Sequence, residues 1–164
     1  MSKLKYKDLR KQVIETCLAM NAEGINQGTS GNVSVRTDEG FLITASGIPY
    51  KKMKPHHVVE MDLEGGYRGD FLPSTEWHMH LDIFRNRPEA KAIVHTHSTY
   101  ATTLACLRKD VPAFHYMIGV TGGPSLRCSD YAEFGTPELS AVMLKAMEGR
   151  NACLLANHGQ ICFG

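Results

Sequence analysis

The spacing of apolar residues predicts helices in four segments of the chain. Between residues 6 and 23, apolar side chains recur every three or four positions and share one face of a helix: Leu9, Val13, Cys17 and Met20. Residues that commonly cap helices mark the start of the other three, at Ser74 or Thr75, at Ser98 and at Thr136. We expect the helix after Ser98 to bury an apolar stripe formed by Tyr100, Leu104 and Leu107.

Short apolar runs between polar or glycine-containing turns predict strands. They lie at residues 33–36, 41–44, 58–62, 92–96, 111–120, 152–156 and 160–163. Strands that alternate with helices and hairpins indicate an α/β fold, with a sheet covered by helices on both faces. No repeat or linker interrupts the pattern, and we therefore expect residues 1–164 to form a single domain.

The composition is that of an ordinary globular protein, with 43% hydrophobic and 21% charged residues among 164. The formal net charge of +1 gives no field that would favour nucleic acid or an anionic membrane. No apolar run approaches the roughly 18 residues of a spanning helix, and the N-terminus lacks a signal-peptide pattern. The five cysteines are scattered and odd in number, which favours reduced thiols in the cytoplasm.

The run Val94-His95-Thr96-His97 carries the clearest candidate chemistry. It follows a predicted buried strand, and residues i and i+2 of a strand point to the same face. His95 and His97 can therefore direct both rings at one point. Neutral imidazole is a common zinc ligand, and a catalytic zinc uses about three protein ligands and keeps one position open.

His158 and Glu76 are the candidates to complete a metal site. His158 lies between an apolar strand and Gly159, and a glycine lets the backbone approach a crowded site, although an ordinary polar loop residue fits the same pattern. Glu76 lies in the first turn of a predicted helix. Its carboxylate could serve as a base, bind the metal or interact favourably with the helix dipole. His80, four residues on, could support this carboxylate, whereas His78 is expected at the surface.

Three small loops offer backbone N–H groups and hydroxyl groups without bulky side chains. They are Gly31-Asn32, Ser46-Gly47 and Ser74-Thr75. Such groups can hold a phosphate, above all at a helix N-terminus. None of the three matches a Walker or dinucleotide motif, and each taken singly is also compatible with an ordinary turn.

Five motifs occur in order along the chain. They are Gly28-Thr29-Ser30-Gly31-Asn32-Val33-Ser34-Val35-Arg36, Leu42-Ile43-Thr44-Ala45-Ser46-Gly47-Ile48-Pro49-Tyr50, Pro73-Ser74-Thr75-Glu76-Trp77, His95-Thr96-His97 and Asn157-His158-Gly159. Together they resemble the class II aldolase/adducin family, with the greatest similarity to its L-fuculose-1-phosphate aldolases. The resemblance covers essentially the whole chain. It implies a three-layer α/β/α fold with a mainly antiparallel central sheet, and a homotetramer with sites near subunit interfaces.

The resemblance also implies roles for individual residues. His95, His97 and His158 would bind one zinc ion per subunit, and Glu76 would be the fourth ligand at rest and the base when substrate displaces it. The residues that match phosphate-binding loops are Gly31, Asn32, Ser46, Gly47, Ser74 and Thr75. Tyr116 would approach the aldehyde from a neighbouring subunit, and Phe134 would lie near the same site. The family's further C-terminal helices, with a second catalytic tyrosine, have no counterpart in these residues.

The activity implied is reversible, zinc-dependent cleavage of a phosphorylated sugar. The substrate would be L-fuculose 1-phosphate or a related deoxypentulose 1-phosphate, and the products dihydroxyacetone phosphate and an aldehyde. Related epimerases, a dehydratase, sugar-acid phosphate decarboxylases and the non-enzymatic adducin head are the alternatives. The epimerases carry a catalytic aspartate shortly after the segment equivalent to Val111-Pro112, whereas residues 113–120 contain no carboxylate. The full set of metal ligands argues against the adducin-like module.

Overall fold

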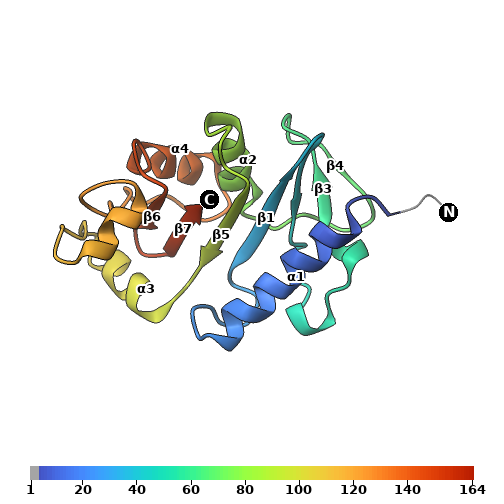
Figure 1. The fold of residues 1–164 in the computed structure, drawn as a ribbon, viewed down its shortest axis with the longest axis horizontal. Coiled ribbons are helices and arrows are strands. Elements are labelled where there is room, and N and C mark those ends of the chain that lie inside the picture. Colours follow the sequence, from blue (N-terminus) through green and yellow to red (C-terminus); the bar gives the residue numbers. More distant parts are fainter. Residues whose placement is uncertain (1–3) are drawn as a thin grey trace.

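A seven-stranded sheet forms the centre of the computed structural model, which describes residues 4–164 (Figure 1). Its strands are β1 (Asn32–Thr37), β2 (Gly40–Ile43), β3 (Val59–Met61), β4 (Tyr67–Arg68), β5 (Ala92–Thr96), β6 (Ala152–Leu155) and β7 (Gly159–Phe163). Their spatial order is β4-β3-β2-β1-β5-β7-β6, and each neighbouring pair is antiparallel. The expected antiparallel sheet is therefore confirmed, and β5 joins an N-terminal group of strands to a C-terminal hairpin.

Helices cover both faces of this sheet (Figure 1). One face carries α1 (Lys7–Ala22) and α3 (Thr99–Cys106), and the other carries α2 (Trp77–Asn86) and α4 (Pro137–Ala146). Short 3-10 helices lie in the connections: η1 (Tyr50–Lys52), η2 (Pro55–His57) and η3 (Tyr116–Thr121). This is the expected three-layer α/β/α arrangement. Across the described residues, no helix has the length and apolar character needed to cross a membrane.

Alternation along the strands divides the core into two layers. On the α1 face, Val33 of β1 and Leu42 of β2 pack with Val13, Cys17 and Met20. On the other face, Ile93 and Ile161 pack with side chains of α2 and α4, including Ile83, Phe84, Leu139 and Met143. The predicted stripe of the first helix is thus confirmed, because three of its four members are buried against the sheet.

The caps of two helices differ in how well the sequence predicts them. Thr136 caps α4 as expected, since its hydroxyl accepts a hydrogen bond from the Leu139 N–H at 3.3 Å. The predicted cap of α2 at Ser74 or Thr75 is wrong, because Glu76 occupies the cap position. The Ser74 N–H donates to the carbonyl of Thr44, which holds this residue beside β2 and delays the start of the helix.

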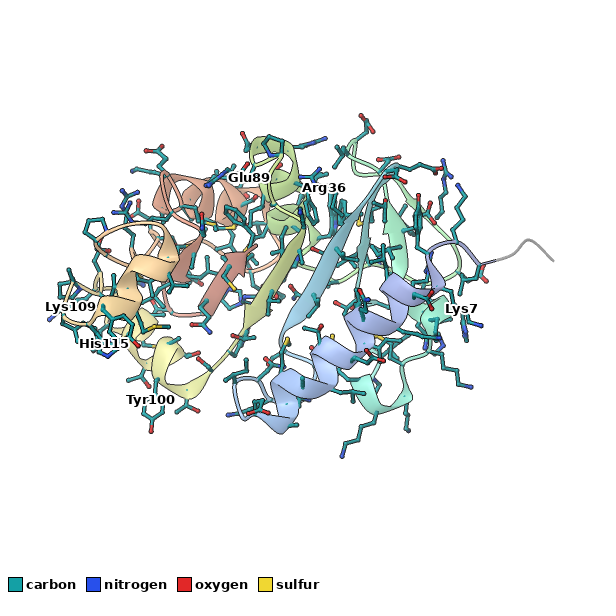
Figure 2. The ribbon with its side chains drawn as sticks, in the orientation of Figure 1. Lys7, Arg36, Glu89, Tyr100, Lys109 and His115 are labelled. Atoms are coloured by element: carbon teal, nitrogen blue, oxygen red, sulfur yellow. The ribbon has the colours of Figure 1, made fainter. Side chains whose placement is uncertain are left out.

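Two other predictions are wrong in the segment that follows β5. Residues 111–120 do not form a strand: Val111 makes one isolated bridge, and η3 follows. Pro112 has no N–H to donate, and in the described part of the chain this segment joins none of the strands of the sheet. The stripe expected on α3 is exposed, with Tyr100 88% accessible, because Ala101 and Ala105 face the sheet instead. Figure 2 shows Tyr100 and His115 projecting outward in this region.

A buried histidine joins α2 to the sheet. His80 is completely buried, and its Nδ1 lies 2.6 Å from the hydroxyl oxygen of Ser34 on β1. Burial lowers the pKa of His80 to about 3, so its ring is neutral in the folded protein near pH 7. The free energy of unfolding should therefore depend on pH through this residue.

We predict that acid destabilises the protein through His80. In the unfolded chain a histidine has a pKa of about 6.5, whereas the pKa of His80 in the folded protein is about 3. Between these two pH values the unfolded chain binds a proton that the folded protein does not. The contribution of His80 to stability is fully present above pH 6.5 and falls as the pH decreases through this window, by roughly 5 kcal/mol in total. Chemical denaturation of wild type and His80→Gln from pH 7.5 to 4 measures the effect, and the variant should lose less stability. Parallel pH profiles would contradict the prediction.

Candidate active site

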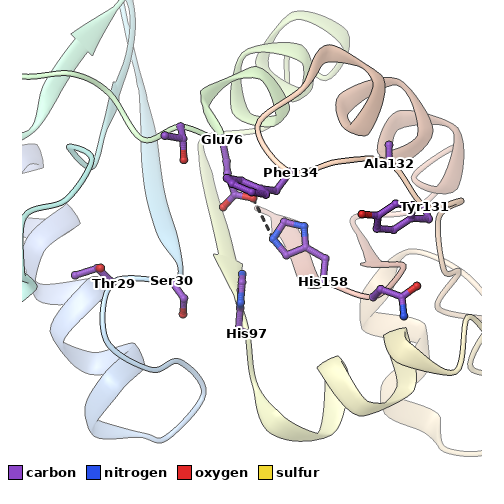
Figure 3. Close-up of a pocket in the computed structure, with 10 residues that line it drawn as sticks. Thr29, Ser30, Glu76, His97, Tyr131, Ala132, Phe134 and His158 are labelled. Atoms are coloured by element: carbon purple, nitrogen blue, oxygen red, sulfur yellow. Dashed lines mark ion pairs between the residues drawn. The ribbon is translucent and has the colours of Figure 1, made fainter.

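Strand β5 brings the two histidines of the His95-Thr96-His97 motif to one point. Ile93, His95 and His97 alternate onto the face that carries α2 and α4, as the strand period requires. The Nε2 atoms of His95 and His97 are 2.9 Å apart. His95 is fully buried, whereas His97 is partly exposed and lines a cavity (Figure 3). The prediction that the two rings converge is confirmed by this geometry.

His158 reaches the same point from the turn between β6 and β7. The centroid of the His158 ring lies 4.9 Å from that of His95 and 4.8 Å from that of His97. Asn157 turns the chain in the left-handed region, at φ 58°, which asparagine tolerates better than most residues. A Cβ on Gly159 would lie 2.5 Å from the Thr96 carbonyl oxygen and 3.1 Å from the His97 ring. Gly159 therefore permits the close approach that the sequence suggested.

Glu76 completes the group from the start of α2. Its Oε2 lies 3.2 Å from His95 Nε2, and its Oε1 lies 3.0 Å from His158 Nε2 (Figure 3). One candidate ligand atom from each of four residues lies within 4.8 Å of all the others: Glu76, His95, His97 and His158. Four ligands about 2.0–2.1 Å from a tetrahedral zinc are separated by about 3.3 Å, and the closest pairs here, at 2.9, 3.0 and 3.2 Å, lie near that spacing.

The donor set fits a cation because its lone pairs face one another. His95 Nδ1 lies 2.8 Å from the Gln160 carbonyl oxygen, which can only accept, so Nδ1 carries the proton and Nε2 presents a lone pair. That lone pair is directed at Glu76 and His97. Among residues 4–164, no donor of ordinary hydrogen-bond geometry reaches the buried Oε1 of Glu76. A divalent metal would satisfy both the lone pair of His95 Nε2 and Oε1 of Glu76. The hydrogen bond from His95 Nδ1 to a backbone carbonyl is typical of histidines that bind a metal.

The electrostatics of the site favour ligand forms near neutral pH. Burial raises the pKa of Glu76, but the imidazoles of His158 and His95 lower it by more, and the resulting pKa lies well below the usual range. Burial, with the neighbouring histidines, lowers the pKa of His97 to about 4. Glu76 is therefore an anion and His97 a neutral imidazole, the protonation states that bind divalent metals.

Asn32 lies behind Glu76 in the sheet. It is 3% exposed, sits opposite His95 across the β1–β5 pair, and donates from Nδ2 to Glu76 Oε2 at 2.8 Å. Its Oδ1 lies 2.5 Å from His80 Nε2. His80 is therefore joined to Glu76 through Asn32, rather than by the direct contact that the helical spacing suggested. His78, expected at the surface, is instead partly buried and stacks on Trp77 with ring centroids 3.7 Å apart.

Three of the candidate ligands, Glu76, His97 and His158, line a cavity of about 360 Å³ (Figure 3), and the buried His95 lies outside its lining. Thr75 lines it, whereas Ser74, Gly31 and Asn32 are buried behind it. Ser46 and Gly47 are exposed outside its lining, although the Ser46 N–H donates to Leu72 and so holds this loop against the segment before Glu76. Gly31 has a packing requirement of its own, because a Cβ there would lie 2.5 Å from the His95 carbonyl oxygen.

The two aromatic candidates lie in different places. Phe134 lines the cavity and projects toward Glu76 (Figure 3). Tyr116 lies on η3, is 83% exposed and is not among the residues that line this cavity. The chain by itself therefore brings Phe134, but not Tyr116, to the candidate metal ligands.

Several lining residues were not singled out from the sequence. Thr29 and Ser30 precede the Gly31-Asn32 loop, and their small hydroxyl side chains could have been included with it. Tyr131 and Asn157 also line the cavity. Asn157 is adjacent to His158 in sequence, but no local pattern marks Tyr131, which reaches the site from the irregular segment before α4.

Comparison with known proteins agrees with this site. The family described as "Class II Aldolase and Adducin N-terminal domain" matches residues 11–164. A 5-methylthioribulose-1-phosphate/5-deoxyribulose-1-phosphate aldolase of Rhodospirillum rubrum is 49% identical over 156 residues, which cover 95% of this chain and 71% of that protein. An L-fuculose phosphate aldolase of Escherichia coli K12 is 47% identical over 153 residues, covering 93% and 71%.

Solved structures show the same fold. An L-fuculose 1-phosphate aldolase superimposes with a TM-score of 0.95 at 42% identity, covering all of this chain and 78% of its own. Relatives of this kind are aldolases, which are lyases, and their family depends on a metal. The chain therefore belongs to the class II aldolase and adducin family, and its enzymatic class is that of the aldolases.

Proposed function

We propose that this protein is a zinc-dependent aldolase that cleaves a ketose 1-phosphate reversibly to dihydroxyacetone phosphate and an aldehyde. L-fuculose 1-phosphate and 5-deoxypentulose 1-phosphates are the candidate substrates, because relatives at 47% and 49% identity carry the corresponding names. The observation that carries the proposal is the convergence of Glu76 with three histidine Nε2 atoms at the wall of one cavity. We expect zinc, because three imidazoles and a carboxylate with no nearby thiolate are typical of catalytic zinc sites.

Glu76 is the proposed base. Aldol cleavage breaks the bond between C3 and C4 of the ketose. The C4 hydroxyl loses its proton and becomes the aldehyde, the bonding electrons pass to an enediolate, and a proton returns to C3. A bound divalent metal supplies a Lewis acid that stabilises the enediolate charge, worth several kcal/mol. Glu76 holds and returns the C3 proton, and Oε1 is the oxygen free to do so, since Oε2 already accepts from Asn32.

The proposed phosphate site lies on the loops around the cavity. Thr29, Ser30 and Thr75 place hydroxyl groups in its lining. Thr29 and Ser30 lie on the opposite side of the cavity from Tyr131 (Figure 3). Ser46, Gly47 and Ser74 extend the same group of loops. Binding energy from the phosphate end can position C3 and C4 relative to Glu76 without taking part in the reaction. Tyr116 remains the candidate proton donor for the aldehyde oxygen, supplied by a second subunit of a homotetramer.

Epimerase, dehydratase and decarboxylase activities are the alternatives within the family. Epimerisation by an aldol route needs a second acid or base near the aldehyde. Residues 113–120 carry no carboxylate, and Glu76 is the one carboxylate among the described residues that line the cavity. Aldol cleavage needs a proton donor on one face of the aldehyde only, the role proposed for Tyr116, because the aldehyde leaves instead of adding back through its other face. A non-enzymatic interaction module would have no use for a buried Glu76 among three histidines.

The substrate assay tests the proposed function. The protein with zinc is incubated with a panel of ketose 1-phosphates, including L-fuculose 1-phosphate and 5-deoxyribulose 1-phosphate, and dihydroxyacetone phosphate release is measured. We expect release from at least one of them and none after chelation of the metal. Interconversion of pentulose phosphates without release of dihydroxyacetone phosphate would favour an epimerase instead.

Replacement of the base should abolish turnover without unfolding the protein. We predict that Glu76→Gln lowers kcat of aldol cleavage by about 10²–10⁴-fold, the usual contribution of general acid–base catalysis. Glu15→Gln, at an exposed position of α1, is the matched control and should leave kcat unchanged. Thermal unfolding confirms that both variants fold. If kcat of Glu76→Gln were within about threefold of wild type, roughly the error of the assay, Glu76 would be excluded as the base.

Replacement of a ligand should lower the zinc content. We predict that His97→Gln and His158→Gln each weaken zinc binding by at least about tenfold. Loss of a residue that only hydrogen-bonds to a metal ligand typically costs that much, and loss of a ligand should cost no less. His56→Gln, an exposed histidine of η2, is the control. Zinc per chain after dialysis against a chelator measures the difference. Equal zinc content in all three variants would place the metal elsewhere.

A further inference from the structure

A line of buried polar groups continues behind Glu76, away from the cavity. Asn32 Nδ2 donates to Glu76 Oε2 at 2.8 Å, Asn32 Oδ1 lies 2.5 Å from His80 Nε2, and His80 Nδ1 lies 2.6 Å from Ser34 Oγ. Ser34 and His80 are fully buried, and Asn32 is 3% exposed. From Ser34 on β1 the line passes to His80 on α2, then to Asn32 on β1 and finally to Glu76 at the start of α2. It therefore links both ends of one helical turn to the sheet.

Only one pattern of donors and acceptors fits this line. The ionised carboxylate of Glu76 can only accept, so the NH₂ group of Asn32 must face it and Oδ1 must face His80. His80 then donates from Nε2, its Nδ1 is the acceptor, and the Ser34 hydroxyl donates to it. His80 is held in a single neutral tautomer. Every group in the line is directed toward Glu76.

A role limited to packing does not explain these residues. Buried polar side chains cost free energy unless each finds a partner, and an apolar contact between α2 and β1 would avoid that cost. The neighbouring strand positions Val33 and Val35 are apolar, whereas Asn32 and Ser34 point to the α2 face. The polar residues occur on the one face where the line can reach the carboxylate.

We propose that His80 and Ser34 are positioning residues for Glu76. They fix the amide of Asn32, which holds Oε2 and leaves Oε1 directed at the candidate metal and substrate. The inference rests on the proposed function, in which Glu76 is ligand and base. It gives Asn32 a second assignment besides the phosphate role expected from the family, because one of its amide hydrogens and its carbonyl oxygen are already engaged.

A matched pair of variants tests this proposal. Glutamine and methionine have similar length and volume, but only glutamine can donate to Asn32 Oδ1. We expect His80→Met to weaken zinc affinity and lower kcat by about 10–100-fold, with KM changed by less than about threefold. His80→Gln should recover most of both losses. Zinc dissociation constants are measured by competition with a chelator, and thermal unfolding shows whether the two variants are equally folded.

A double-mutant cycle separates positioning from general damage. In an Asn32→Leu background the line to Glu76 is already broken, so His80→Met and His80→Gln should behave alike. Equal zinc affinity and equal kcat for the two variants in the wild-type background would overturn the proposal. A difference between them that persists with Asn32→Leu would overturn it as well.

The tautomer of His80 provides a measurement that needs neither zinc nor substrate. In ring-¹⁵N NMR spectra of the metal-free wild-type protein, His80 should show a protonated Nε2 and an unprotonated Nδ1 near pH 7. The opposite tautomer would overturn the proposal, even if His80→Met fails to fold. A wild-type protein that cleaves no ketose 1-phosphate would remove the proposed function, whereas the zinc affinities and the tautomer would still decide the positioning inference.

Discussion

The antiparallel pairing of β5 with β1 on one side and β7 on the other holds the candidate site together. It sets His95 opposite Asn32 in one strand pair and opposite Ile161 in the other. His97 follows at the end of β5, and the β6–β7 turn brings His158 to the same end. Glu76 is added where α2 begins above this edge. A shift of one residue in either strand pair would send His95 to the opposite face of the sheet and disperse the group.

The same register explains why so many polar side chains are buried at one place. Five polar side chains are buried here, none of them more than 6% exposed: Asn32, Ser34, His80, His95 and Glu76. Each is costly to bury alone, but each has a partner in this group or faces the candidate metal. Apolar packing surrounds them, with Ile93 and Ile161 beneath and the α2–α4 layer beside. The site is therefore closely packed at its base, and Thr29 and Thr75 line the cavity from exposed loops.

Local patterns account for the parts of this structure that the sequence predicts. The His95–His97 spacing follows from the strand period, and the capped start of α4 follows from Thr136 and Pro137. The failures come from long-range context. Residues 111–120 have the composition of a strand, but Val111 alone of them makes a β-bridge within the described part of the chain, to Leu126. Tyr100, Leu104 and Leu107 form a stripe that residues 4–164 leave exposed. The contact of Asn32 with Glu76 depends on the strand register, which joins residues 44 apart in sequence. The i+4 spacing predicts that His80 lies near Glu76, but it does not predict the contact of each with Asn32.

The central claim is that Glu76, His95, His97 and His158 hold one zinc ion in front of the cavity. X-ray absorption at the zinc edge of the purified protein tests it most directly. We predict one zinc per chain, with a shell of nitrogen and oxygen ligands at about 2.0–2.2 Å and the outer-shell scattering of about three imidazoles. Sulfur ligands at about 2.3 Å, or a protein that retains no stoichiometric zinc, would contradict the account.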